Sequence, residues 1–380
     1  MQRRTFVSKT LTGYTLGWAS CSLLRRLLAD ESPRGKGTPA ERHARASRVL
    51  QQAVEAKQVA AATIFTRCGN QHQSSAFGTA QDEHAMFLLG SISKPIAVAA
   101  LMTLYDRKAF ELEDLASRYL PAFRGEGRER VTIRQLLTHV SGLPDQLPEN
   151  AALRAKKASL AEFAEAAQRT PLSFAPGTKY QYSSMAILLA ARIAEQLSGE
   201  SIQSLVERAI FRPLGMTRSA QGRGAFQLDE FIPVQTERAA PEAGGGDPQA
   251  REWDWNSVYW RSLGAPWGGT HASAPDLGKL LAEFLHPTGA IMKSETLRLM
   301  IANHNLTGLT PRGLGWNVGA AAGARGCSER TFGHTGSTGT LAWADPATDE
   351  ICVILTSLPG RAVQPHPREL STAEFNANRG

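Results

Sequence analysis

The stretch FLLGSISKPIAVAALM, residues 87–102, places two serines, a lysine and a proline in front of a long apolar run. Proline is tolerated in a helix only within the first turn, because its missing N–H has no intrahelical partner there. Pro95 therefore predicts that a helix begins close to Ser91, and the apolar run 96–105 predicts that this helix is buried. The unpaired N–H groups of such a helix start would stabilise negative charge near Ser91.

Lys94 lies three residues after Ser91, so the amine and the hydroxyl are expected on the same face of the helix. Cations are disfavoured at helix N-termini, and a solvated lysine is not expected in front of a buried run. A partly buried lysine has a lowered pKa and can accept a proton from a serine. Ser91 is thus a candidate nucleophile with Lys94 as its base, although this short pattern alone fits a helix cap equally well.

The composition favours a folded enzyme or binding protein over a nucleic-acid binder. The chain has 380 residues, 42% of them hydrophobic, which is enough for one large domain or two. The net charge of +7 comes from residues 1–48, and residues 49–380 are formally neutral. We therefore expect no nucleic-acid partner.

The spacing of cysteines and histidines predicts neither a disulfide framework nor a metal site. Four cysteines lie far apart, no CxxC pattern occurs, and no paired Cys/His spacing typical of metal ligands is present. A metal site is therefore not expected.

The N-terminus resembles a twin-arginine export signal. Arg3 and Arg4 precede a mildly apolar stretch, residues 11–24, which is too short and too polar to span a bilayer comfortably. The alternative is an ordinary disordered N-terminus. We expect export to the periplasm or the exterior, with membrane contact only through this segment if it is not cleaved.

The order of helical and strand patterns predicts an α+β fold. Two strands flank a turn at 68–70, helical patterns dominate from 91 to 215, and strands return near the C-terminal end. We expect one antiparallel sheet flanked by helices and built from both termini, with a mainly helical region inserted into it. The predicted segments are a signal and linker (1–40), a sheet region (41–90 plus 290–360), a helical region with the active-site motifs at its interface (91–289) and a polar tail with little reason to pack (361–380).

Further stretches follow GSISK in a recognisable order: RQLLTHVSGLPD (134–145), PGTKYQYSSMAILLA (176–190), GGTHASAPDLGKLL (268–281), GLGW (313–316) and FGHTGSTGTLAWADP (332–346). With them, the chain resembles the serine β-lactamase-like and penicillin-binding protein superfamily. It is most similar to the group around class C β-lactamases, D-alanyl-D-alanine peptidases and related esterases. The resemblance runs from about residue 42 to 358.

This resemblance implies roles for individual residues. Ser91 would be the acylated nucleophile, Lys94 its proton partner, and Tyr182 the group that protonates the leaving group and then activates water. A phenol has a pKa near 10 in water, so we expect a nearby ammonium such as Lys94 to lower the pKa of Tyr182. The backbone N–H groups of Ser91 and Ser337 would form the oxyanion hole.

His334, Thr335 and Gly336 resemble the third motif of the family, on a strand that edges the cleft. Two positions depart from the family pattern. Ser184 replaces the asparagine that usually ends the second motif, which weakens an expected contact to a substrate amide. His334 replaces the lysine of true β-lactamases, and a partly charged histidine is a weaker anchor for a substrate carboxylate.

With this resemblance, the sequence predicts an exported serine hydrolase that cleaves an ester or amide of a small-molecule or peptide substrate through a covalent acyl-enzyme. The resemblance implies that no metal or organic cofactor is needed. An esterase, a D-Ala-D-Ala carboxypeptidase and a weak β-lactamase all remain open. The alternative is a non-catalytic penicillin-binding-like module that binds cell-wall peptide without turnover. We interpret His139 as a structural hydrogen-bonding residue, and the tryptophan-rich stretch 253–267 as packing that anchors a long loop.

Overall fold

The computed structural model describes residues 37–377, so the predicted export signal lies outside the described residues and stays a prediction. The first helix, α2 (Pro39–Glu55), begins inside the segment expected to be a linker. Thr38 and Glu41 form a capping box at its start, in which each side chain accepts the backbone N–H of the other residue. None of the helices described is both long and apolar enough to cross a lipid bilayer.

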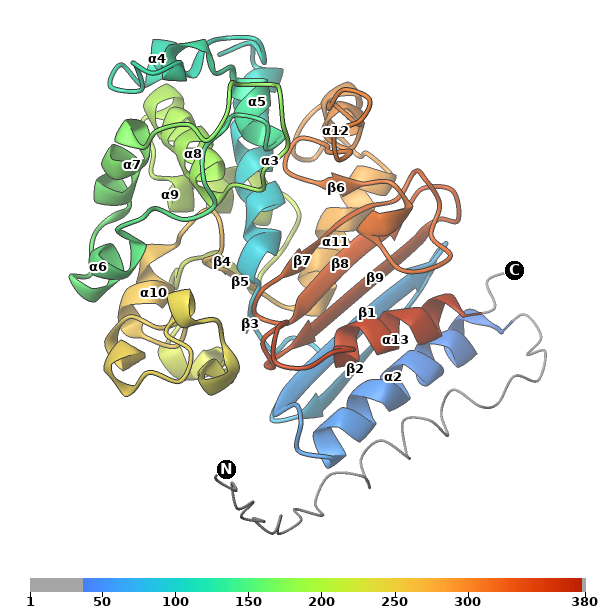
Figure 1. Ribbon diagram of the computed structural model, residues 1–380. Coiled ribbons are helices and arrows are strands. Elements are labelled where there is room, and N and C mark those ends of the chain that lie inside the picture. Colours follow the sequence, from blue (N-terminus) through green and yellow to red (C-terminus); the bar gives the residue numbers. More distant parts are fainter. Residues whose placement is uncertain (1–36, 378–380) are drawn as a thin grey trace, which may run out of the picture. The chain divides into compact units, whose positions relative to one another are not determined.

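The predicted antiparallel sheet built from both termini is confirmed. In the described part of the chain it has six strands in the order β2-β1-β9-β8-β7-β6, and every neighbouring pair is antiparallel (Figure 1). Two strands come from the N-terminal side and four from the C-terminal side. The bounds are β1 (Ala61–Cys68), β2 (Gln71–Gly78), β6 (Asn317–Val318), β7 (Phe332–Gly336), β8 (Thr340–Asp345) and β9 (Glu350–Thr356).

Both faces of the sheet are covered, which explains the unbroken apolar run of β9. Side chains alternate along a strand, so Cys352 and Ile354 join one core with α2, while Val353 and Leu355 join the larger core on the opposite face. The helix α11 (Ala274–Leu285) packs on this second face, against β9 (Figure 1). The predicted boundary at residues 289 and 290 is therefore wrong, because α11 belongs to the sheet layer.

The expectation that the tail 361–380 does not pack is also wrong. Residues 367–376 form α13 (Pro367–Asn376), which lies beside α2 on the sheet (Figure 1). Phe375 is buried there, and Ser371 Oγ donates to the carbonyl of Ala46 at 2.9 Å. Most buried groups of α13 are polar and paired, so a search for apolar periodicity does not detect this helix.

The inserted region is helical as predicted, with the buried helix α3 (Ser93–Asp106) at its centre, packed against α8. A single 3₁₀ turn, η1 (Gly90–Ile92), leads into α3, so Pro95 does stand in the first turn. A second, three-stranded sheet of β3 (Phe87–Leu88), β5 (Thr270–Ala272) and β4 (Ser219–Gln221) was not predicted. The other helices are α4 (Ala116–Tyr119), α5 (Ile133–Leu137), α6 (Asn150–Ala155), α7 (Leu160–Arg169), α8 (Ser184–Ser198), α9 (Ile202–Val206), α10 (Val258–Leu263) and α12 (Ser294–Met300).

A buried ion pair ties α2 to β9 and to α13. Arg42 Nη1 lies 2.5 Å from Glu350 Oε1, and Arg42 Nε donates to the carbonyl of Phe375 at 2.8 Å. We expect Glu350→Ala to lower the free energy of unfolding by about 3–5 kcal/mol, because it leaves the Arg42 cation buried and unpaired.

Urea unfolding measures this loss, and Glu374→Ala is the matched control on the same pair of helices. Glu374 approaches Arg45 only at 3.9 Å and is about one-third exposed, so its loss should cost less than about 1 kcal/mol. Equal effects of the two substitutions would contradict the assigned role of the buried pair.

Candidate active site

Ser91 and Lys94 meet where η1 passes into α3. Lys94 is fully buried, and its Nζ donates to Ser91 Oγ at 3.0 Å and to the carbonyl of Trp267 at 2.9 Å. Burial lowers the pKa of Lys94 to about 7; the Asp145 carboxylate opposes this shift and the Arg312 cation adds to it. The predicted lowering of the Lys94 pKa is confirmed, and the neutral amine that can take a proton is present near pH 7.

Gly90 allows the turn after β7 to approach the nucleophile. Its φ of 57° lies in the left-handed region, and an added Cβ would stand 3.0 Å from both Ser337 N and Thr338 Oγ1. Thr338 Oγ1 donates to the carbonyl of Leu88 at 2.6 Å, which fastens this turn to the segment before Ser91. The amide of Ser337 is therefore held next to Gly90, and its oxyanion role stays a prediction.

Tyr182 reaches the same place from the segment before α8. Its side chain hydrogen-bonds with that of Ser91, and Lys94 Nζ lies 4.7 Å from the centroid of its ring. The structure thus brings together the three predicted catalytic residues from separate parts of the chain.

The expected lowering of the Tyr182 pKa is wrong. Burial raises the pKa of the phenol, and the Arg312 cation and the hydrogen bond with Ser91 offset this only partly. Desolvation prevails because the half-buried phenol is largely enclosed by protein, while Lys94, with a pKa of about 7, is only partly charged at pH 7. Tyr182 therefore stands protonated at rest.

His334 does not lie free to bind a substrate carboxylate. It is 3% exposed, its Nδ1 donates to the carbonyl of Thr335 at 2.7 Å, and its Nε2 accepts from Arg312 Nη2 at 2.9 Å. Burial first, and then the Arg312 cation, hold the pKa of His334 well below its usual range. The predicted anchoring role is thereby corrected: His334 is a neutral, internally bonded ring, while Thr335 and Ser337 are the exposed residues of this edge.

Arg312 is the residue that sequence reasoning missed. It is 1% exposed, its Nη2 also lies 3.0 Å from His139 Nε2, and its Cζ lies 5.6 Å from the centroid of Tyr182. The available signal was a charged residue directly before the apolar stretch GLGW. True β-lactamases carry a lysine at the position of His334 on β7. In this chain the cation near the site is Arg312, which lies in the loop before β6.

Ser184 is also turned inward. It is 2% exposed, and both its Oγ and its backbone N–H donate to Asp145 Oδ1, at 2.6 and 2.9 Å. The predicted contact of the Ser184 hydroxyl with substrate is therefore replaced by an internal pair. Asp145, which the sequence analysis did not single out, places a carboxylate close enough to act on the pKa of both Lys94 and Tyr182.

Two interpretations of loop residues are confirmed. His139 has a φ of 61°, its carbonyl accepts from Gln181 N at 2.9 Å, and its Nδ1 accepts from Ser183 N at 3.2 Å, so it orders the segment that carries Tyr182. The tryptophan-rich stretch packs inward, with three of its four indoles buried. It also provides the Trp267 carbonyl that binds Lys94, a backbone contact that no side-chain pattern reveals.

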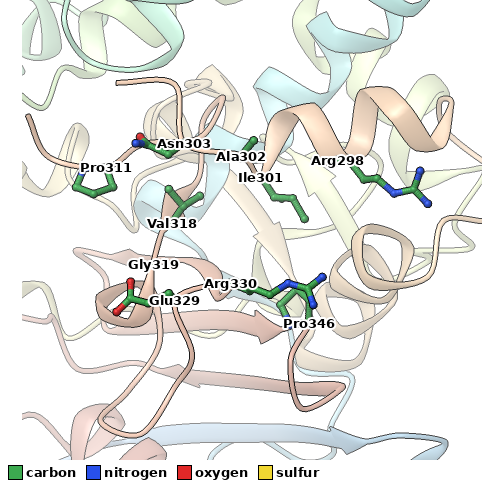
Figure 2. A pocket seen from close by; sticks show the side chains of 10 residues that line it. All are labelled: Arg298, Ile301, Ala302, Asn303, Pro311, Val318, Gly319, Glu329, Arg330 and Pro346. Atoms are coloured by element: carbon green, nitrogen blue, oxygen red, sulfur yellow. The ribbon is translucent and has the colours of Figure 1, made fainter. Parts of the chain in front are cut away.

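A surface hollow of about 510 Å³ lies apart from this cluster (Figure 2). Its lining includes Arg298, Arg330, Ile301 and Val318, and none of the catalytic residues. Within residues 37–377, no group of three His, Cys, Asp or Glu side chains is arranged to hold a metal ion.

Comparison with known proteins agrees with this fold. A protein of Escherichia coli O157:H7 named "Putative D-alanyl-D-alanine carboxypeptidase" is 26% identical over 403 residues, which cover 93% of this chain and 91% of its own length. The solved structure of EstCE1, "a hydrolase with promiscuous acyltransferase activity", has a TM-score of 0.73 at 20% identity and covers 89% of this chain and 99% of its own. A penicillin-binding protein homologue from Caulobacter crescentus has a TM-score of 0.71 at 19% identity, covering 88% and 97%.

The family model described as Beta-lactamase matches residues 46–376, from α2 to the end of α13. This range contains all three motifs and both halves of the sheet, and the solved neighbours share the antiparallel sheet flanked by helices. The chain therefore belongs to the Beta-lactamase family.

Proposed function

We propose that this protein is a serine hydrolase that cleaves esters of uncharged acyl groups through a covalent acyl-enzyme. The observation that carries the proposal is the buried amine of Lys94, hydrogen-bonded to Ser91 Oγ at 3.0 Å and lying over the ring of Tyr182. A nucleophile, a neutral base and a protonated acid are thereby within reach of one another.

In acylation, the neutral amine of Lys94 takes the proton of Ser91, and Ser91 Oγ attacks the carbonyl carbon of the substrate. The N–H groups of Ser91 and Ser337 stabilise the oxyanion that forms. The bond to the leaving group breaks as the leaving group receives the proton of the Tyr182 phenol. The site then holds an acyl-serine, a Lys94 ammonium and a Tyr182 phenolate, with the Arg312 cation beside the phenolate.

In deacylation, the Tyr182 phenolate takes a proton from water, and the resulting hydroxide attacks the acyl carbon. The bond to Ser91 Oγ breaks, and the serine recovers its proton from the Lys94 ammonium. All three residues return to their starting protonation states, so the cycle needs no co-reactant besides water.

The charges around the site favour an uncharged substrate. The Lys94 amine and the Arg312 cation next to Tyr182 are both buried, His334 is neutral, and the Asp145 carboxylate is only half-buried. A substrate with a free carboxylate would meet this acidic group without an exposed cationic partner in the cluster. Because a hydrogen bond to a charged group contributes about 1.5–3 kcal/mol, its lack disfavours such substrates by about 10- to 100-fold.

D-Ala-D-Ala carboxypeptidase activity is the second candidate, because relatives that are 26–28% identical carry that name. Rates on p-nitrophenyl butyrate, a D-Ala-D-Ala peptide and nitrocefin, measured side by side, separate the candidates. We expect the ester to exceed the other two by about 10- to 100-fold in kcat/KM, and Ser91→Ala to abolish all turnover.

Intact-mass analysis after fluorophosphonate treatment locates the label and provides the control. One adduct on the native protein and none on Ser91→Ala are expected. Faster hydrolysis of the D-Ala-D-Ala peptide than of the ester would contradict the esterase proposal and favour a carboxypeptidase. A burst without steady turnover on every substrate would favour the non-catalytic binding module.

The pH dependence tests the assignment of Lys94 as base. Only the neutral amine can accept a proton, and its pKa is about 7, so kcat/KM for the ester should rise with pH and level off above about pH 7. Arg312→Met removes a cation that lowers the pKa of Lys94, so the rising acid limb of the pH profile should move to higher pH. Arg312→Lys keeps the charge and should leave the limb near its native position.

Arg261→Met is the matched control. Arg261 is likewise a buried arginine over an aromatic ring, that of Phe231, but it lies in α10 and donates to the carbonyls of Leu228 and Ile232. Its loss should affect stability and leave the pH limb in place. The assignment of Lys94 as base would be contradicted if the acid limb of the native protein lay below pH 5. Equal shifts of this limb in Arg312→Met and Arg261→Met would also contradict it.

A further inference from the structure

An arginine of the unpredicted helix α13 reaches the turn that carries Ser337. Arg368 is 8% exposed, and its Nη1 donates to the carbonyl of Gly336 at 2.6 Å and to that of Thr340 at 3.0 Å. These two carbonyls bracket the turn between β7 and β8. A single guanidinium nitrogen therefore bridges the two ends of the turn.

The same turn is fastened on its other sides as well. Gly360 N donates to the carbonyl of Ser337 at 2.9 Å, and Thr340 Oγ1 donates to that of Leu89 at 2.6 Å. Gly336 is pressed against the segment before the nucleophile, since an added Cβ would stand 2.0 Å from the oxygen of Leu89. Any shift of the turn would therefore move the Ser337 amide relative to Ser91.

The position of Arg368 is electrostatically unfavourable for the helix itself. It is the second residue of α13, where the helix dipole disfavours a cation, and burial lowers the pKa of its guanidinium. His366 fixes this helix start: its Nδ1 accepts from Arg368 N at 3.1 Å, and its Nε2 donates to the carbonyl of Leu358 at 3.1 Å. The carbonyls of the turn thus compensate a cation that neither the helix dipole nor burial favours.

We propose that Arg368 is a positioning residue for the oxyanion hole, which it serves by bridging the carbonyls of Gly336 and Thr340 and so fixing the Ser337 amide. This inference rests on the proposed acyl-enzyme function. It assigns to the C-terminal helix a part in transition-state stabilisation, although α13 lies on the far side of the turn from Ser91. Substrate contact by Arg368 is not required.

The test compares Arg368→Met and Arg368→Lys with the native protein in ester hydrolysis. Loss of a complete oxyanion donor typically costs about 10²–10³ in rate, so a displaced donor should cost about 10- to 100-fold in kcat, with KM little changed. Lysine keeps the charge and one donor group, and should recover part of the rate. The acid limb of the pH profile should not move, because Lys94 is untouched.

The inhibition constant of phenylboronic acid separates positioning from partial unfolding. The boronate forms a tetrahedral adduct on serine and mimics the transition state, so its inhibition constant should rise by about the same factor as kcat/KM falls. A variant that merely contains fewer folded molecules would lose rate with an unchanged inhibition constant. The Lys variant provides this comparison even where the Met variant does not fold.

Arg45→Met is the matched control, because Arg45 donates to the carbonyl of Ala377 at 3.0 Å, at the opposite end of α13. It should alter stability without changing the inhibition constant. Equal inhibition constants for native protein, Arg368→Met and Arg368→Lys would overturn the positioning role. A native protein without ester turnover or fluorophosphonate labelling would instead overturn the proposed function.

Discussion

The desolvation of one amine is the constraint on which the rest of the site depends. Lys94 is the second residue of α3, whose residues 93–104 are all buried, and its own side chain is fully buried. An ammonium in that position is costly, and the neutral amine becomes accessible near pH 7. Without this cost, Lys94 would remain a cation and could not take the proton of Ser91. In the proposed mechanism, the burial of α3 is therefore needed for catalysis as well as for stability.

The surrounding charges are arranged around this amine. Arg312 contributes a permanent cation from beneath the ring of Tyr182, and the neutral ring of His334 accepts one of its hydrogen bonds. Asp145 shifts the pKa of Lys94 in the opposite direction to Arg312, and it accepts a hydrogen bond from the inward-turned hydroxyl of Ser184. The two positions where the sequence departs from the family pattern, 184 and 334, thus belong to one rearrangement. Positive charge lies in the interior rather than at the exposed edge of β7, and this is the basis of the proposed preference for uncharged substrates.

The sequence revealed the features that depend on local pattern and failed where tertiary partners decide. Pro95 and the run after it located the helix start, and the short apolar runs of β8 and β9 located the C-terminal strands of the sheet. Both signals arise from the residues of one segment. Arg312 and Asp145 were missed because their roles depend on residues more than twenty positions away. The raised pKa of Tyr182 was missed because burial cannot be read from one side chain. Helix α13 was missed because most of its buried side chains are polar and reach partners in α2, β7 and β8. Ser371 donates to Ala46, and Arg368 donates to Gly336 and Thr340.

The most direct test of the central claim is an NMR titration of the Lys94 side chain. The protein would be labelled with ¹³C at the lysine ε-carbon, and the Lys94 signal assigned with Lys94→Arg. Because the amine is fully desolvated, its titration midpoint should lie near pH 7, well below the ordinary lysine value of about 10.4. A midpoint above pH 10 would show that Lys94 is a cation at neutral pH, and the proposed proton transfer from Ser91 would then be excluded.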